Sequence, residues 1–444
     1  ILNASELSND ENQFGFQNGA STSMCTWMVI EVINQFKLSG SPVYGCLLDY
    51  RKAFDLVNHK KLFEILIERN VSLIFVRILI FIYLHQKCYI KWQNTRSYSF
   101  SVTNGTRQGS VFSPMGGFGC YLDPLLKELR NSGLGCRLGQ YWYGAMAYAD
   151  DLILLSTSIT GLQNMVDICQ KHAHENDLLF SSDPDPNKSK TVCIAFNCKN
   201  KLSIGSIYLN GNKLPWKEQY KHVGNYIHED GTMNKDLSVK RAEFIQACMN
   251  QNDEFECLPI QSKIKLLNIY NSHFTGSNLW DFDSKNVNQL SNSWNVNLRI
   301  ICKLPIDTHK YLIEQISESS HFKKKIYTRY ISFVKSLTNS KKSSVNFLFK
   351  LVSKDVRTGT GSNLRSIYDN TDVYIVPGKT LKSALKNYMV FKTPTGQNWR
   401  ISLLSSLIQI REGEWTLSFD EEQDNASYVP TDAINKMIES ICNS

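Results

Sequence analysis

Two adjacent carboxylates, Asp150 and Asp151, stand between two short apolar runs. The runs at 144–149 and 152–155 flank a tight polar turn, a pattern that predicts a β-hairpin with both acids at its tip. Neighbouring carboxylates repel each other, so a divalent cation beside them would be stabilising. Hard ions such as Mg²⁺ take oxygen ligands and leave positions open for substrate phosphates. Because Asp-Asp is also a common surface dipeptide, other parts of the chain must decide between a metal site and a solvated turn.

A third carboxylate, Asp49, directly follows an apolar run at 43–48. The run predicts a buried strand, and the apolar spacing at 62–66 predicts that a helix follows after a turn. An acid at the end of such a strand projects where ligands bind in open sheets with helices alongside. Alternatively, Asp49 caps the N-terminus of a helix.

Two further stretches carry groups suited to phosphates or bases. Gly105 and Gly109 permit close backbone approach, while Arg107 and Gln108 offer donors to a phosphate or a base edge. The run Asn-Lys-Ser-Lys-Thr at 187–191 follows a proline-rich turn and precedes a predicted strand. Neither stretch alone is specific enough to identify a binding site.

The net charge of +8 is concentrated in one segment. Residues 321–357 hold ten basic residues against the single acid Asp355, which gives +9 there and leaves −1 for the remaining chain. Aromatic residues alternate with the charges, so the segment suits a phosphate backbone, with rings for packing or base stacking. A solvated helical face has the same pattern. The basic residues are Lys323, Lys324, Lys325, Arg329, Lys335, Lys341, Lys342, Lys350, Lys354 and Arg357.

Length and composition are those of a globular protein. The 444 residues, 42% of them apolar and 20% charged, allow two or three domains and exclude wholesale disorder. The longest apolar stretch, 73–84, has only 12 residues and contains Arg77, so it predicts a buried helix and not a membrane span. Other helices are predicted after a Ser-Thr-Ser cap at 21–23 and at 240–250, 263–274 and 287–302, and short strands at 208–212 and 220–227.

Twelve cysteines are present without any Cys-x-x-Cys pair. This usage predicts buried, reduced thiols in an intracellular, reducing compartment, with neither disulfides nor structural zinc. The first residues, Ile1-Leu2-Asn3, contain neither an initiator Met nor a signal pattern, so we expect the sequence to begin inside a longer product.

Taken in order, these stretches resemble the motifs of reverse transcriptases from non-LTR (LINE-type) retrotransposons. Four motifs in one order are far more specific than any one of them, and the match covers about residues 13–230 and more loosely the stretch to 340. The segments are 49–55 (motif A), 107–110 with 113–114 (motif B), 148–151 (motif C), 187–191 (motif D), 13–16 (a fingers motif) and 221–224 (the primer-grip region).

The resemblance implies an α+β fold, a right-hand polymerase. Residues 1–233 would form partial fingers and an antiparallel-sheet palm, 234–345 a helical thumb-like region with the start of the basic segment, and 346–444 a C-terminal extension of unassigned role. The implied activity is RNA-directed DNA polymerisation on an RNA template with a DNA primer or target and dNTPs. No membrane is involved, and the resemblance places the protein in the nucleus or cytoplasm.

The resemblance also assigns roles to residues. Asp49 and Asp150 would bind two Mg²⁺ ions, with Mn²⁺ as a substitute, and Asp151 would be the more dispensable neighbour. Phe54 would lie under the nucleotide sugar, and Lys188 or Lys190 would approach the leaving phosphates, the two being inseparable from sequence. The nucleotide-binding set is Tyr50, Phe54, Arg107, Gln108, Gly109, Lys188 and Lys190, and the nucleic-acid-binding set is Lys323, Lys324, Lys325, Arg329, Lys341 and Lys342.

Some positions depart from the pattern. Gln17 and Ala20 stand where relatives usually carry Arg, and residues 115–119 are unusually rich in glycine, so this chain could be a truncated or decayed copy. The alternatives are therefore an inactive nucleic-acid-binding remnant, an intron-encoded reverse transcriptase or a viral replicase. A replicase more often has Gly at the position of Ala149. A primer-extension assay distinguishes the inactive remnant from an active polymerase, because a remnant would bind nucleic acid without extending the primer.

Overall fold

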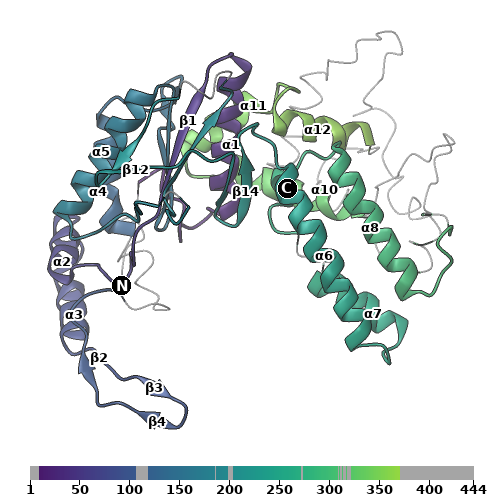
Figure 1. Ribbon diagram of the computed structural model, residues 1–444, viewed down its shortest axis with the longest axis horizontal. Helices are drawn as coiled ribbons and strands as arrows, with labels where there is room; N and C mark the ends of the chain where they lie inside the picture. Colours follow the sequence, from purple (N-terminus) through teal and green to yellow (C-terminus); the bar gives the residue numbers. More distant parts are fainter. Residues whose placement is uncertain are drawn as a thin grey trace, which may run out of the picture. The chain divides into compact units, whose positions relative to one another are not determined.

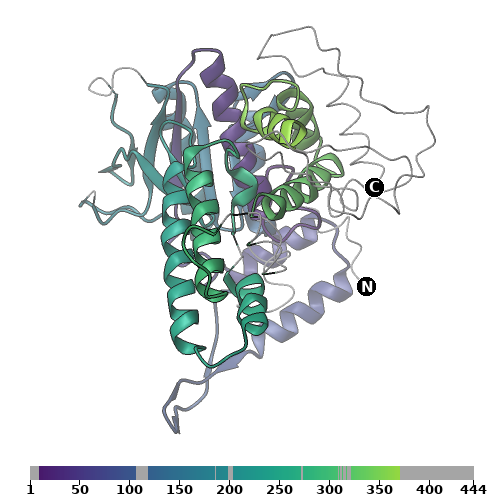
Figure 2. The same ribbon diagram turned by 90° about the vertical axis from the view of Figure 1, so that its right-hand side faces the viewer.

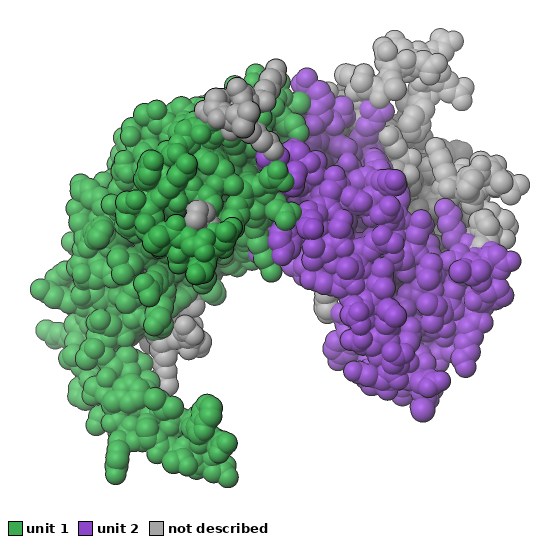
Figure 3. Space-filling model, in the orientation of Figure 1, with its two compact units in different colours: residues 1–223 green, residues 224–444 purple. Residues whose placement is uncertain are grey.

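The computed structural model describes residues 10–106, 119–185, 187–198, 204–271, 274–308, 310, 313, 317 and 322–370. The chain divides into two compact units, residues 1–223 and 224–444 (Figure 3). The first combines a sheet with helices, and in the described part of the second helices predominate. This mixture agrees with the α+β class predicted from the sequence.

A four-stranded antiparallel sheet forms the centre of the first unit, with strand order β10-β1-β9-β8. All four strands had been predicted from apolar runs, and β1 lies between two strands that follow it by more than a hundred residues. Their bounds are Val43–Leu48 (β1), Ala145–Tyr148 (β8), Asp151–Ser156 (β9) and Val192–Phe196 (β10).

Helices cover both faces of this sheet (Figure 1). Cys46 and Leu48 of β1 pack with Leu152 and Leu154 of β9 in one buried cluster that also contains residues of α4 and α5. The other face carries α1, whose N-cap Ser21 accepts a hydrogen bond from the Met24 N–H at 3.1 Å, as the cap pattern predicted. The helices are α1 (Thr22–Leu38), α2 (His59–Glu68), α3 (Leu73–Leu84), α4 (Cys120–Asn131) and α5 (Ile159–Glu175).

Short strands complete the first unit. Most of them form two-residue ladders around tight turns, as at Asn210-Gly211 between β11 and β12, whereas β13 is four residues long. Their bounds are Lys87–Cys88 (β2), Lys91–Trp92 (β3), Thr95–Arg96 (β4), Phe100–Ser101 (β5), Arg137–Leu138 (β6), Tyr141–Trp142 (β7), Tyr208–Leu209 (β11), Asn212–Lys213 (β12) and Gln219–His222 (β13).

The prediction for residues 73–84 was half correct. The segment is a helix, α3, but most of it is not buried: only Val76, Leu79 and Tyr83 are buried, and Phe75 and Ile80 pack partly against the core. The helix packs on α2 along a single stripe, so the apolar residues on its other sides remain exposed. These residues are Leu73, Ile74, Ile78, Phe81, Ile82 and Leu84.

The second unit is held together by aromatic side chains. Trp294 stacks on Phe244 with ring centroids 5.8 Å apart, and Phe274 packs edge-on against Trp280 at 6.0 Å. Trp280 and Trp294 are fully buried and belong to the core of this unit. The elements are β14 (Asn225–His228), α6 (Asn234–Glu254), α7 (Ile260–Leu266), the π-turn η3 (Leu267–Asn271), η4 (Ser277–Leu279), α8 (Lys285–Ile301), α10 (Phe322–Thr338), α11 (Ser343–Val352) and α12 (Gly359–Asn370).

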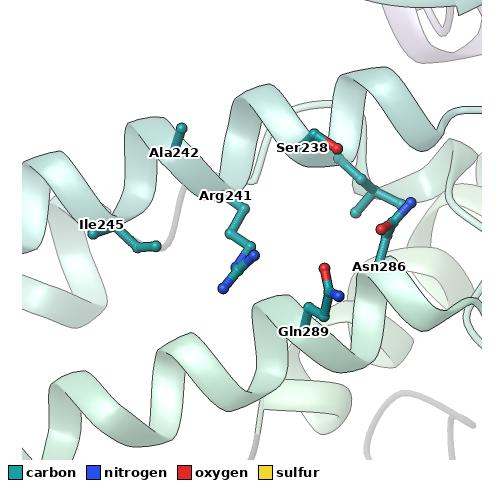
Figure 4. A pocket seen from close by; sticks show the side chains of 7 residues that line it. Ser238, Arg241, Ala242, Ile245, Asn286 and Gln289 are labelled. Carbon is teal, nitrogen blue, oxygen red and sulfur yellow. The ribbon is translucent and has the colours of Figure 1, made fainter.

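Helices α6 and α8 lie side by side (Figures 1 and 2). A shallow hollow of about 190 Å³ lies between them, and Figure 4 shows Arg241 of α6 and Gln289 of α8 pointing into it. Arg241 Nε donates a hydrogen bond to Ser293 Oγ at 2.9 Å. The residues that line the hollow include none of the predicted site residues.

The predicted domain boundaries lie near or within observed elements. The division at 223 precedes the predicted end of the palm at 233 by ten residues. The predicted boundary after 345 falls inside α11, so the helical unit continues through α12. The assignment of thumb and extension stays a prediction. Within the described residues every cysteine is a free thiol, and no helix is both long and apolar enough to cross a membrane.

Candidate active site

The register of the sheet brings Asp49 beside the paired carboxylates. Strands β1 and β9 are antiparallel with Leu48 opposite Leu152, so the next position pairs Asp49 with Asp151. Neighbouring strands lie about 4.8 Å apart. Tyr50 belongs to the same buried cluster as Leu48, so alternation turns Asp49 to the face of the sheet away from α4 and α5. Acids a hundred residues apart in the chain therefore meet at one end of the sheet.

Asp150 occupies the two-residue turn that joins β8 to β9. Tyr148 pairs with Asp151 across this turn, leaving Ala149 and Asp150 at the tip. Ala149 has φ of +56°, in the left-handed region that a side chain with a Cβ rarely adopts. This conformation costs about 1–2 kcal/mol. The turn therefore needs contacts from outside the hairpin.

Gln13 supplies these contacts. Its Oε1 accepts hydrogen bonds from the Ala149 N–H at 2.9 Å and the Gly15 N–H at 2.8 Å, and its Nε2 donates to the Ala149 carbonyl at 3.2 Å. The Gln13 side chain is fully buried. A Cβ on Gly15 would lie 2.2 Å from the Ala149 nitrogen, so only glycine permits this approach. Both peptide groups of the strained residue are thus held by one carboxamide.

The segment that carries Gln13 is anchored at both of its ends. The Phe14 N–H donates to the Ala147 carbonyl at 2.7 Å, and the Ala147 N–H donates to Asn12 at 2.9 Å, so the segment pairs with β8. Upstream, the Asp10 N–H donates to Asp123 Oδ1 at 2.9 Å, and Arg130 forms an ion pair with Asp10. The turn with Asp150 is therefore connected through Gln13 to α4.

Asp49 is fixed by its backbone. Its N–H donates to Thr191 Oγ1 at 3.3 Å, and its carbonyl accepts from the Ser181 N–H at 2.7 Å. Burial raises the pKa of Asp49, and the positive charge of Lys190 partly opposes this increase. Lys188 instead pairs with Asp185, 3.8 Å away. Of the two lysines that the sequence could not separate, Lys190 is the one that acts electrostatically on Asp49.

Burial and neighbouring carboxylates together raise the pKa of Asp150 and of Asp151. Burial raises the pKa of Asp150, and the charge of Asp49 raises it further despite a backbone hydrogen bond that lowers it. Partial burial, followed by repulsion from Asp150 and Asp49, raises the pKa of Asp151 to about 6. Since Asp150 and Asp151 are destabilised as anions by neighbouring carboxylates, a cation placed beside them would be bound favourably.

The donor set suits an ion that arrives with its substrate. Among the described residues, no three carboxylate, imidazole or thiolate groups lie close enough to form a ready-made metal centre. Mg²⁺ is commonly held by one or two carboxylates together with waters and substrate phosphates. Asp49 and Asp150 are carboxylates of the kind that such an incomplete site uses.

Phe54 and Tyr50, both predicted to contact nucleotide, differ in their environments. Phe54 is half-buried, and its carbonyl accepts from the Thr106 N–H at 2.7 Å, which ties its turn to the segment before motif B. The Tyr50 ring is 5% exposed and lies 4.1 Å from the ring of Phe180. Alternation along the strand turns the Tyr50 side chain into the core, and the predicted role of Tyr50 in nucleotide binding stays a prediction. The predicted residues Arg107, Gln108 and Gly109 lie outside the described residues.

The basic segment does not form one exposed stripe. Lys325 Nζ donates to Asn268 Oδ1 at 2.7 Å and lies 5.1 Å from the Trp294 ring centre, and burial lowers its pKa to about 8. The Arg329 guanidinium lies 5.9 Å from the ring of Phe274. Both side chains pack within the second unit, because α10 turns one face inward. Their predicted contact with nucleic acid stays a prediction. Lys323, Lys324 and Lys342 are partly exposed and Lys341 is exposed.

Phe347 in this segment is half-buried. Four other aromatic residues of the segment are buried, so their rings pack in the helical core and are not available for base stacking. They are Tyr327, Tyr330, Phe333 and Phe349.

The sequence matches the family described as reverse transcriptase (RNA-dependent DNA polymerase) over residues 2–227, which is about half of the chain. The chain therefore belongs to this family. It is 26% identical over 226 residues to the retrovirus-related Pol polyprotein from type-1 retrotransposable element R2 of Nasonia vitripennis, covering 49% of this chain and 21% of that protein. The corresponding protein of type-2 element R2DM of Drosophila melanogaster is 27% identical over 187 residues, 41% of this chain and 17% of that protein.

These relatives confirm the resemblance to non-LTR retrotransposon reverse transcriptases, and the family confirms the right-hand polymerase class. The chain spans about a fifth of the length of the curated relatives that it matches. Among solved structures, telomerase from Candida tropicalis in complex with a fragment of telomeric RNA aligns with a TM-score of 0.40 at 12% identity. That alignment covers 84% of this chain and 53% of the telomerase chain.

Three contacts at the site were not foreseen from the sequence: the Gln13 carboxamide, the Thr191 hydroxyl and the Asp10–Arg130 ion pair. Gln13 had been noted only within a motif of the fingers. The spacing of Gln13 and Gly15 was the available signal, since a buried amide two residues before an obligatory glycine indicates close backbone contact.

Replacing Gln13 should destabilise the first unit. Gln13→Leu removes three hydrogen bonds and leaves buried N–H groups of Ala149 and Gly15 without this acceptor, so we expect a loss of about 2–4 kcal/mol in unfolding free energy. Urea denaturation measures it. Gln246→Leu, the same change at an exposed position of α6, should cost less than about 0.5 kcal/mol. Equal effects of the two substitutions would contradict the role given to Gln13.

The carboxylate cluster should make stability fall with rising pH. Because the folded-state pKa of Asp151 is raised to about 6, the folded protein binds a proton more tightly than the unfolded chain between pH 4 and 6. Asp151→Asn should therefore stabilise the metal-free protein at pH 7 by about 1 kcal/mol, after allowing for solvent screening, and have no such effect at pH 4. Urea denaturation in EDTA at both pH values is the measurement. The exposed Glu64→Gln is the control, and a pH-independent effect of Asp151→Asn would refute the repulsion.

Proposed function

We propose that this chain is the polymerase part of a non-LTR retrotransposon protein and copies RNA into DNA by two-metal nucleotidyl transfer. The observation that carries the proposal is the placement of Asp49 beside Asp150 and Asp151 at one end of the sheet, within a segment that belongs to the reverse transcriptase family. The RNA template, the DNA primer or target and the dNTPs are part of this proposal. The intracellular location implied by the resemblance stays a prediction.

Asp49 and Asp150 are the residues that would hold the metal ions. When bound, such ions lower the pKa of the primer 3′-hydroxyl and neutralise the charge that develops on the leaving pyrophosphate. Asp49 is held in place through Thr191 and Ser181, and Asp150 is held through the contact of Gln13 with Ala149. Rigid support of this kind is needed because small displacements of catalytic groups reduce rates severely.

Lys190 is the better candidate for contact with the leaving phosphates. Its charge already acts on Asp49, whereas Lys188 is engaged with Asp185. A cation beside the metal-binding carboxylate can stabilise the phosphate charge that appears in the transition state. These two contacts support Lys190 over Lys188 for this role.

Asp150→Asn should abolish primer extension, with a loss of at least a hundredfold, and leave nucleic-acid affinity unchanged, because one oxygen ligand is altered and the fold is not. Extension of a labelled DNA primer on an RNA template with Mg²⁺, together with a binding assay, measures both. Asp167→Asn on α5 is the matched control and should retain activity. Near-normal extension by Asp150→Asn would refute the metal assignment, whereas binding without extension by the unmodified chain would support the inactive remnant.

Phe54→Val should relax the choice of sugar. If the ring lies under the nucleotide sugar, its flat face leaves no room for a 2′-hydroxyl, the group that distinguishes the two sugars. We expect the ratio of ribonucleotide to deoxyribonucleotide incorporation to rise at least tenfold, which corresponds to about 1.4 kcal/mol. Competitive incorporation on one template gives the ratio. Slower synthesis at an unchanged ratio would mean that Phe54 acts only through its packing against the core.

A further inference from the structure

A hairpin arm extends from the end of α3. We call residues 87–101, which include β2, β3, β4 and β5, the arm. Figure 1 shows β2, β3 and β4 running out from α3, away from the four-stranded sheet. Every residue from 89 to 101 is exposed, so this part of the arm contributes nothing to the core of the first unit.

The aromatic residues of the arm have no structural role of their own. Trp92 is 75% exposed and Tyr98 is 98% exposed, and Tyr89 and Phe100 are each half exposed. An isolated two-stranded ribbon has no second layer against which such rings could be buried. Elsewhere in the chain the large aromatic residues Trp280 and Trp294 are fully buried. The rings of the arm are therefore available to a ligand, and exposed aromatic clusters commonly mark binding surfaces.

The charge of the arm is of one sign. Lys87, Lys91 and Arg96 are exposed on it, and the sequence has no acid between Glu68 and Asp123. Lys91 lies opposite Arg96 in the ladder, and the Arg96 guanidinium lies 5.0 Å from the centre of the Tyr89 ring. Cations thus alternate with aromatic faces over a few residues. No nearby acid in the sequence neutralises them.

We propose that the arm binds single-stranded nucleic acid. The cations would contact phosphates, and the rings of Trp92 and Tyr98 would stack on bases, the combination by which proteins hold single strands without sequence preference. In a duplex the faces of the bases are stacked on one another, so a duplex would bind the arm only through contacts between phosphates and cations. A protein partner fits less well, because lysine is depleted at the centre of protein interfaces. The proposal rests on the proposed function, which supplies single-stranded template and product.

Two double variants separate stacking from charge. Trp92→Ala with Tyr98→Ala removes rings, and Lys91→Gln with Arg96→Gln removes charges, all at exposed positions where the melting temperature should not change. Affinities come from fluorescence anisotropy with labelled 20-nucleotide oligo-U, oligo-dT and a 20-base-pair duplex at several salt concentrations. Tyr208→Ala, an exposed ring on β11, and Lys60→Gln with Lys171→Gln, exposed cations on α2 and α5, are the controls.

We expect the ring variant to raise Kd for single strands at least tenfold and to leave the duplex nearly unaffected, since stacking contributes about 1–3 kcal/mol per base. The charge variant should reduce the salt slope for single strands by about 1.4, from two phosphate contacts of about 0.7 each. If the variants lose affinity only for oligo-U, the ligand of the arm is an RNA strand. If they lose affinity only for oligo-dT, the ligand is a DNA strand.

The remaining outcomes overturn the proposal. If the unmodified chain binds oligonucleotides and the arm variants bind as tightly as the controls, the arm has no such role and the proposed function stands. If the unmodified chain binds no nucleic acid, the proposed function fails together with the arm. If the ring variant leaves Kd unchanged but light scattering shows loss of self-association, the arm is an interface between copies of this chain.

Discussion

The strained turn at Ala149 is the constraint around which the first unit is built. A left-handed alanine followed by two carboxylates is unfavourable both in its backbone and in its charge. One buried carboxamide, from Gln13, offsets the backbone part by binding the N–H and the carbonyl of Ala149. The charge part is offset only in part, by a backbone hydrogen bond that lowers the pKa of Asp150.

Local sequence patterns predicted the parts of this arrangement, and the register of the sheet decided how they meet. The apolar runs that end at Asp49 and that flank Asp150 predicted strands β1, β8 and β9, because such runs are recognised from their periodicity and length alone. The sequence could not show that Tyr50 turns inward while Asp49 turns outward, because this follows from which face of β1 the helices cover. The choice between Lys188 and Lys190 likewise depends on a tertiary contact, the proximity of the motif D segment to β1.

Burial was the property that the sequence predicted least well. The predominantly apolar α3 indicated a buried helix, yet it contacts its neighbours along one stripe only. The mixed segment around α10 indicated a solvated or phosphate-binding face, yet Lys325 and Arg329 lie over the rings of Trp294 and Phe274. Amphipathic side chains can bury their stems and place a cation on an aromatic ring, so charge alone does not determine which face of a helix is outside.

The order of strands also has a consequence for biosynthesis. Strand β1 lies between β9 and β10, and both of these leave the ribosome more than a hundred residues after it. During that interval a strongly apolar strand has two unpaired edges, a state that favours pairing with other chains. Pairing over such long sequence separations is intrinsically slow. The yield of correctly folded protein should therefore depend more on the rate of translation and on chaperones that bind early segments than on the stability of the finished fold.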